Sequence, residues 1–243
     1  MKNIHKLVLA PLSMMLFLGA CGNAVPETPE PETEPVTFEE TQIPVTDPRE
    51  ETAEDLEIDF SAQYALIPDL VGWLYAADAG IDTPVVQSEE DGYYRSHDAH
   101  GDEAPQGAVY LETGADEDLM DPVSIVTGSA EADGALNGLM NYAEPEFFEQ
   151  HEKLQYCHPY GPLTYTVIAA WEEEKGADEA LFAADAAFDG ILGEITAKAM
   201  GKNLRRERAE HTGAGDRLLV LRGNVSDGTR CYIVAGVLEG IEE

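Results

Sequence analysis

Lysine and arginine are scarce in this chain. Only 14 of the 243 residues are Lys or Arg, against 48 Asp and Glu, so the formal net charge is −34. Binding to nucleic acid needs clustered cations that neutralise phosphates, and this composition excludes a nucleic-acid partner. The same negative charge repels anionic polymers and anionic lipid surfaces.

Cysteines and long apolar runs are also few. The three cysteines are Cys21, Cys157 and Cys231, too few for a disulfide framework, and whether the last two pair is left open. The apolar run from Leu7 to Leu18 is shorter than the about 20 residues that a membrane-spanning helix needs. It is typical of a signal peptide rather than of a membrane anchor.

Residues 1–21 have the full order of a bacterial lipoprotein signal. Lys2 and Lys6 precede the apolar run, and the segment ends in Leu18-Gly19-Ala20-Cys21 without any acidic residue. We predict that Cys21 is acylated and attaches the mature chain to membrane lipid, because two acyl chains give stable anchoring. An ordinary secretory signal that happens to contain a cysteine is the alternative.

Residues 22–55 form a distinct acidic segment. It holds six of the 14 prolines and eleven Asp or Glu, with Arg49 as its single basic residue. Such a segment cannot bury enough apolar surface to offset chain entropy, so we predict a disordered tether. The remaining 188 residues, 56–243, are enough for one domain with a full core, and their net charge is about −26.

Local patterns in residues 56–243 predict a mainly β domain of the α+β class with a few helices. Helical periodicity favours a short helix over 56–67, two helical turns in 136–151 separated by Pro145, and the longest helix over 180–200. β-Branched and aromatic segments bounded by Gly, Pro or Asp predict strands at 85–86, 107–111, 123–126, 164–170, 217–222 and 230–238.

The run from Asp69 to Asp98 carries the most specific pattern. It contains Val71-Gly72-Trp73, then a turn entering an apolar strand at 81–86, then two tyrosines before Ser96-His97-Asp98. This run resembles the start of a class B sortase domain, and the order of predicted elements resembles that family along the whole of 56–243. Sortases are cysteine transpeptidases of the Gram-positive cell envelope. The resemblance implies a sortase-like eight-stranded β-barrel with an N-terminal helix, a turn at 71–73 and a long helix before the penultimate strand.

The same resemblance locates three site positions. The family's histidine follows a strand in a "YGHN"-like motif, and Ser129 stands there; its cysteine ends the penultimate strand in "LSTC", and Asn224 stands there. Arg230 opens the last strand, as the family pattern expects, and the resemblance makes it a substrate-binding residue. An amide at neutral pH offers no nucleophile and a serine cannot relay protons as imidazole does, so no catalytic pair is intact.

Other residues have side chains that could form a relocated catalytic or metal site. Cys157-His158 has the residue types of a thiolate and its base, but it precedes a predicted turn. His97, Asp98 and His100 are possible metal ligands, although the resemblance makes them scaffold residues; we expect no metal and no cofactor. The sequence therefore predicts a lipid-anchored, catalytically inactive protein on the outer face of the plasma membrane that binds an extended peptide or a cell-wall component. The alternative is an active sortase with a relocated active site.

Overall fold

The computed structural model describes residues 58–174, 188–200, 207–213, 215–225 and 230–240. The predicted signal peptide and tether, and the first half of the predicted long helix, lie outside these residues. The strands are β1 (Leu70–Ala76), β2 (Ile81–Val86), β3 (Tyr110–Leu111), β4 (Val123–Ser129), β5 (Lys153–His158), β6 (Gly161–Glu174), β7 (Leu218–Asn224) and β8 (Arg230–Leu238). The helices are α1 (Phe60–Tyr64), α2 (Pro145–Gln150) and α3 (Phe188–Met200), with 3₁₀ turns η3 (Ala77–Ala79), η4 (Tyr93–Arg95), η5 (Asn137–Ala143) and η6 (Glu207–His211).

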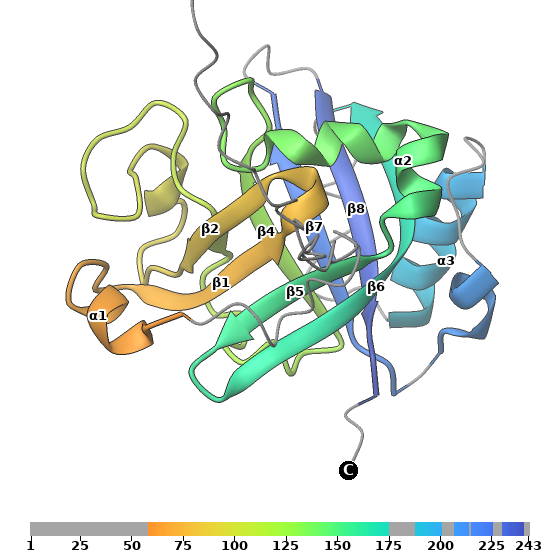
Figure 1. Ribbon diagram of the computed structural model, residues 1–243, viewed down its shortest axis with the longest axis horizontal. Coiled ribbons are helices and arrows are strands. Elements are labelled where there is room, and N and C mark those ends of the chain that lie inside the picture. The colour runs from red at the N-terminus through yellow and green to blue at the C-terminus, as the bar shows by residue number, and fades with distance from the viewer. Residues whose placement is uncertain (1–57, 175–187, 201–206, 214, 226–229, 241–243) are drawn as a thin grey trace, which may run out of the picture. The chain divides into compact units, whose positions relative to one another are not determined.

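The strands form a closed barrel in the order β1-β2-β3-β4-β7-β8-β6-β5 (Figure 1). This confirms the predicted mainly β fold with eight strands. The β4–β7 and β2–β3 pairs are parallel and the other pairs are antiparallel. Among the described residues, no helix is both long and apolar enough to cross a membrane.

The central strands are buried on both faces, which is why they read as nearly continuous apolar runs. On β7, Leu219 and Leu221 point into the barrel, whereas Leu218 and Val220 belong to a second cluster outside it. Ile195 of α3 and Ala209 of η6 pack in that outer cluster, and Figure 1 shows α3 beside β6 and β8. Alternate side chains on one strand therefore serve two cores.

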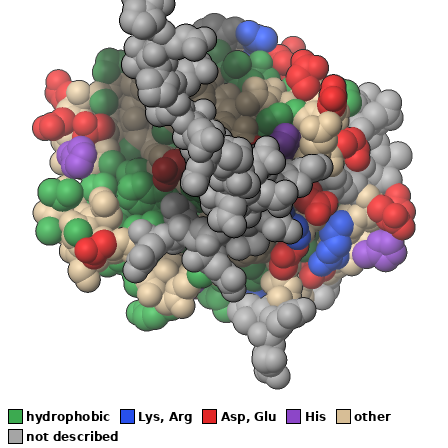
Figure 2. All heavy atoms as spheres, viewed as in Figure 1, with side chains coloured by type: hydrophobic (Ala, Val, Ile, Leu, Met, Phe, Trp, Pro, Cys, Tyr) green, Lys and Arg blue, Asp and Glu red, His purple; other side chains and the backbone are tan. Residues whose placement is uncertain are grey.

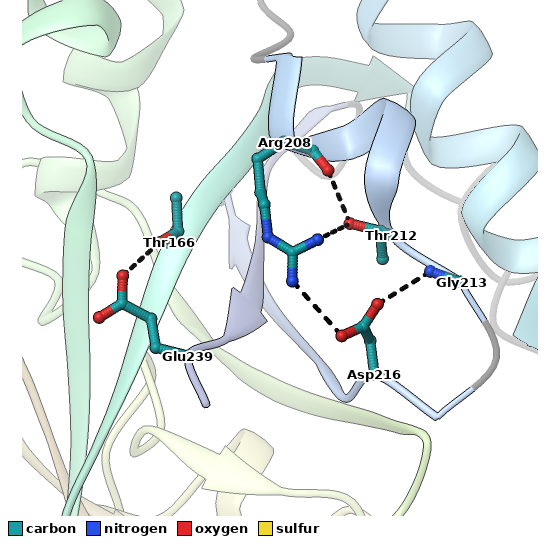
Figure 3. Close-up of polar contacts among 6 residues, drawn as sticks. All are labelled: Thr166, Arg208, Thr212, Gly213, Asp216 and Glu239. Carbon is teal, nitrogen blue, oxygen red and sulfur yellow. Dashed lines mark hydrogen bonds and ion pairs between the residues drawn. The ribbon is translucent and has the colours of Figure 1, made fainter. Parts of the chain in front are cut away.

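The segment between α3 and β7 is held by its own polar contacts. Arg208 pairs with Asp216 at 3.4 Å, and the other oxygen of that carboxylate accepts a hydrogen bond from the Gly213 backbone at 2.9 Å (Figure 3). The Thr212 hydroxyl donates to the Arg208 carbonyl at 3.0 Å. These bonds join η6 to the start of β7, so they help to set where the penultimate strand begins.

The predicted turn at 71–73 is wrong, because these residues lie inside β1. A register irregularity falls between Leu70 and Gly72, and a Cβ at Gly72 would lie 2.2 Å from the ring of Tyr156. The glycine therefore marks a place where the fully buried Tyr156 ring crosses the strand rather than a reversal of the chain. Trp73 then donates from Nε1 to Asp82 Oδ1 at 2.6 Å, which ties β1 to β2.

One end of the barrel is covered by short helical segments. The strand directions place the C-terminal ends of β1, β4, β6 and β7 and the start of β8 at the same end. There η5 packs so closely on η3 that a Cβ at Gly138 would lie 1.7 Å from the Ala79 carbonyl oxygen. Pro145 separates η5 from α2, as predicted. This end carries the three predicted site positions.

Candidate functional site

Ser129 and Asn224 are brought together by the barrel. They are the last residues of β4 and β7, and they are direct partners in the parallel pairing of these strands. Paired residues on neighbouring strands project their side chains to the same face of the sheet. Both residues are half-buried, and the Ala130 amide donates to the Asn224 carbonyl at 2.8 Å, which extends the pairing by one bond.

The loop that follows β4 holds Ser129 in place. The Ser129 carbonyl accepts from the Leu136 amide at 2.9 Å, and its hydroxyl accepts from the Glu131 amide at 3.3 Å. Gly128 and Gly223 precede the two site residues, and a Cβ at either would lie 3.0 Å or less from Leu136 or Ala130. The two glycines therefore allow the loop and η5 to pack against the strand ends.

Arg230 lies at the same end of the barrel but on the other face of the sheet. Cys231, its neighbour on β8, is the direct partner of Asn224, so alternation assigns Asn224 and Cys231 to one face and Arg230 to the opposite one. The Arg230 guanidinium pairs with Glu172 of β6 at 3.2 Å. The structure thus unites two of the three predicted positions on one surface and separates the third from them.

Cys231 stands directly across from Asn224 but is fully buried. It packs in the outer cluster with apolar residues that include Ile233 and Ile195. Neither β4 nor β7 contains a cysteine or a histidine. The paired ends of β4 and β7 therefore present a hydroxyl and an amide, and the neighbouring thiol is closed off from solvent.

Cys157 and His158 do not form a reactive pair. Cys157 lies on β5, which the barrel order separates from β4 and β7, and it is buried. Burial, with the charge of Asp82 as a second cause, raises the pKa of the Cys157 thiol to about 11, so it is a neutral thiol at pH 7. The His158 ring accepts from the Tyr160 amide at 3.2 Å. The two cysteines that the structure describes, Cys157 and Cys231, do not form a disulfide.

The polar residues near position 98 have structural roles. The His97 ring stacks on Tyr93 with ring centres 4.0 Å apart. The Asp98 carboxylate accepts from the amides of His100 and Asp102 at 2.9 and 3.0 Å, which closes the loop locally. Within the part of the chain that the structure describes, no three His, Cys, Asp or Glu residues form a metal-binding group.

A polar cluster on the same face as Ser129 and Asn224 was missed from the sequence. Arg222 lies two residues before Asn224 on β7 and pairs with Thr127 of β4, which pairs in turn with Tyr110 of β3. Alternation in the sequence would have placed Arg222 on the same face as Asn224, but only the barrel places Tyr110 on the other side of Thr127 from Arg222.

Together, the closed strand order, the long helix before the penultimate strand and the site positions at the ends of β4, β7 and β8 define a class B sortase-like domain. Comparison with known proteins agrees. Sortase B of Listeria monocytogenes is 29% identical over 105 residues, which cover 43% of this chain and 43% of that relative. The match thus spans less than half the length of the relative. No protein-family model matches the chain.

Solved structures resemble a larger part of this chain than the sequence match does. The crystal structure of Staphylococcus aureus sortase B superposes with a TM-score of 0.63 and 16% identity, covering 75% of this chain and 87% of that one. A Streptococcus pyogenes class B sortase involved in pilus biogenesis gives a TM-score of 0.62 and 22% identity, covering 75% and 98%. The fold is therefore that of class B sortases, while the chemistry of the site must be argued from this chain's own residues.

Proposed function

We propose that this protein is a lipid-anchored, catalytically inactive sortase-like protein of the Gram-positive cell envelope that binds an extended peptide or a cell-wall fragment. The observation that carries the proposal is the pair of Ser129 and Asn224 at the ends of two parallel strands. The scaffold that would present a thiolate and an imidazole is kept, and the residues there cannot form an acyl intermediate. A retained surface without a nucleophile supports binding rather than transfer.

The anchoring part of the proposal rests on the sequence. Residues 1–21 end in a lipobox-like Leu-Gly-Ala-Cys, and the acidic tether of 22–55 would extend the domain away from the membrane. We expect the full chain to fractionate with membranes when produced in a Gram-positive host, and Cys21→Ser to appear in the medium or the soluble fraction. Equal membrane retention of Cys21→Ser would contradict lipid attachment.

Binding is tested with the full chain in detergent. A pool of labelled random octapeptides and a soluble cell-wall digest are the probes, and fluorescence anisotropy or mass spectrometry reads what is retained. We expect Asn224→Trp to abolish retention, because an indole would cover the strand ends, and Ser61→Trp, an exposed position on α1, to leave it unchanged. Absence of any retained peptide or wall fragment would contradict the binding function.

The alternative is an active sortase whose nucleophile has moved. Its one favourable observation is that Cys231 lies opposite Asn224, and burial of both described cysteines opposes it. Reactive cysteines are partly exposed and have a depressed pKa, whereas the pKa of Cys157 is raised. We expect a thiol-trapping peptide electrophile to leave the native protein unlabelled. Rapid labelling at Cys157 or Cys231, with amine-dependent peptide cleavage, would establish the enzyme instead.

A further inference from the structure

A row of polar side chains crosses three neighbouring strands beside the Ser129–Asn224 pair. Tyr110 of β3 pairs with Thr127 of β4, and Thr127 pairs with Arg222 of β7. Because residues two apart on a strand share a face, this row and the Ser129–Asn224 row lie on the same surface. On β4 and β7 the two rows follow the apolar outer pair of Ile125 and Val220, and Tyr110 is buried in a separate apolar cluster. The rows therefore form a polar patch at one end of an otherwise apolar outer face.

Two arginines in this patch share one carboxylate. Glu112, which follows β3, places Oε1 at 3.5 Å from Arg222 and Oε2 at 3.7 Å from Arg95. Arg95 also makes a side-chain hydrogen bond with Tyr110, which raises the pKa of Arg95. Asp91 also acts on the Arg95 guanidinium, and the net charge of the domain is about −26, so two arginines that share one carboxylate are a local exception to its acidity. Figure 2 shows how strongly Asp and Glu outnumber Lys and Arg on the visible face.

The shared carboxylate is loosely held. Charge-assisted hydrogen bonds from guanidinium to carboxylate are usually about 2.7–2.9 Å long, so contacts of 3.5 and 3.7 Å are weak for their type. The side chains of Arg95 and Glu112 are 60% and 33% exposed, which lowers the energy of that pair further. Glu112 can therefore be displaced by another carboxylate at small cost.

Thr127 adds a second, independent observation. Its side chain is fully buried between Tyr110 and Arg222 in the pairing, and its hydroxyl oxygen has no hydrogen-bond partner in the structure. Burying a hydroxyl without a hydrogen-bond partner destabilises the folded state. The polar row next to Arg222 is therefore not fully paired in the free protein.

We propose that Arg222 and Arg95 form a carboxylate-binding site, and that it holds an acidic or C-terminal carboxylate of the extended peptide that lies along the Ser129–Asn224 row. Glu112 occupies this site in the free protein and yields it to the ligand. The proposal rests on the peptide-binding function proposed above, and it names the ligand chemistry and the residue that selects it. A planar carboxylate fits because Glu112 already bridges the two arginines with its two oxygens.

The test uses the full chain and one labelled octapeptide retained from the random pool. The peptide is made with a free C-terminus, with an amidated C-terminus, and with each Asp or Glu replaced by Asn or Gln. We expect removal of one of these carboxylates to weaken binding at least tenfold, and Arg222→Gln to weaken the parent peptide by a similar factor. The same Arg222→Gln variant should bind the carboxylate-free peptide as the unmodified protein does.

Two further variants complete the design. Glu112→Gln should tighten binding of the acidic peptide severalfold, because the internal competitor loses its charge. Arg217→Gln removes the same charge just before the other end of β7, where Arg217 donates to the Met120 carbonyl, and should leave the affinity unchanged. Circular dichroism and unfolding midpoints establish that each variant is folded.

The outcomes separate the two proposals. If octapeptides bind but neither the loss of their carboxylates nor Arg222→Gln changes the affinity, the carboxylate site is wrong and peptide binding stands. If Glu112→Gln weakens binding, Glu112 contacts the ligand rather than competing with it, and the site is also wrong. Tighter retention of inorganic phosphate than of acetate by the Arg222-dependent site would replace the carboxylate by a phosphate ligand. If no octapeptide binds but the cell-wall digest is retained, the carboxylate site is wrong and the binding function stands; if neither is retained, both proposals fail.

Discussion

Ser129 and Asn224 are direct partners across the parallel pair of β4 and β7, at the end of the barrel where both strands stop. Neighbouring strands lie about 4.8 Å apart, so side chains at these positions can contact each other without any movement of the backbone. Two side chains therefore meet at this end of the barrel, and in this chain they are a hydroxyl and an amide.

Restoring the two residue types should restore a reactive thiol. We predict that Asn224→Cys combined with Ser129→His is alkylated by iodoacetamide at pH 7 at least tenfold faster than Asn224→Cys alone, because an adjacent imidazolium lowers the pKa of a thiol. Mass spectrometry assigns the label to position 224. Equal rates for the single and double variants would show that the two side chains do not meet.

The native thiol of Cys157 should be unreactive at neutral pH. Its pKa is raised to about 11 by burial, above the ordinary value for cysteine, so the folded state keeps a proton that the unfolded state loses first. The thiol therefore favours folding at lower pH, and this contribution falls as the pH rises from about 9 towards 11. Alkylation should be negligible at pH 7 and rise steeply above pH 10, and fast labelling at neutral pH would contradict the burial.

The contact between η5 and η3 should tolerate no extra atom. Gly138→Ala would place a methyl group 1.7 Å from the Ala79 carbonyl oxygen, and we expect it to lower the free energy of unfolding by about 1–3 kcal/mol. Gly190→Ala is the matched control, because among the described residues no atom outside the surrounding helix backbone lies within 4 Å of its Cβ position on α3; there alanine should stabilise by up to about 1 kcal/mol. Urea unfolding measures both, and equal effects would contradict the close packing.

The bond between Trp73 and Asp82 should be measurable as a coupling. Trp73 Nε1 donates to Asp82 Oδ1 at 2.6 Å across β1 and β2, and the acceptor is charged. We expect Trp73→Phe, Asp82→Ala and the double variant to give an interaction free energy of about 0.5–1.5 kcal/mol in urea unfolding. A coupling near zero would mean that the bond is not held in solution.

Several elements were predictable because their signals are local. Pro145 separates η5 from α2, and β8 has the predicted bounds of Arg230–Leu238. The strand predicted at 123–126 continues to Ser129, and that predicted at 217–222 continues to Asn224. Both extensions include a glycine followed by a polar residue, and these two residues end the apolar pattern that predicts a strand. Pairing between the two strands stabilises the extensions in the structure.

Two strands had no adequate local signal. β1 contains Gly72, which favoured a turn. β5 ends at His158, and the prolines and glycine that follow it favoured a turn rather than a strand there. Both lie beside each other in the barrel, so each is stabilised mainly by partners distant in sequence. The strand predicted over 107–111 is reduced to Tyr110–Leu111, because only these residues find a partner on β4.

The sequence by itself determined the acidity and the class of fold, and it predicts which residues stand at the family's site positions. It also predicts the lipid anchor and the tether of residues 1–55, which stay predictions. Only the tertiary structure decided which side chains share a surface: closure of the barrel pairs Ser129 with Asn224, turns Arg230 to the other face and places Thr127 between Arg222 and Tyr110. Strand register is fixed by packing between distant segments, and no local pattern in the chain records it.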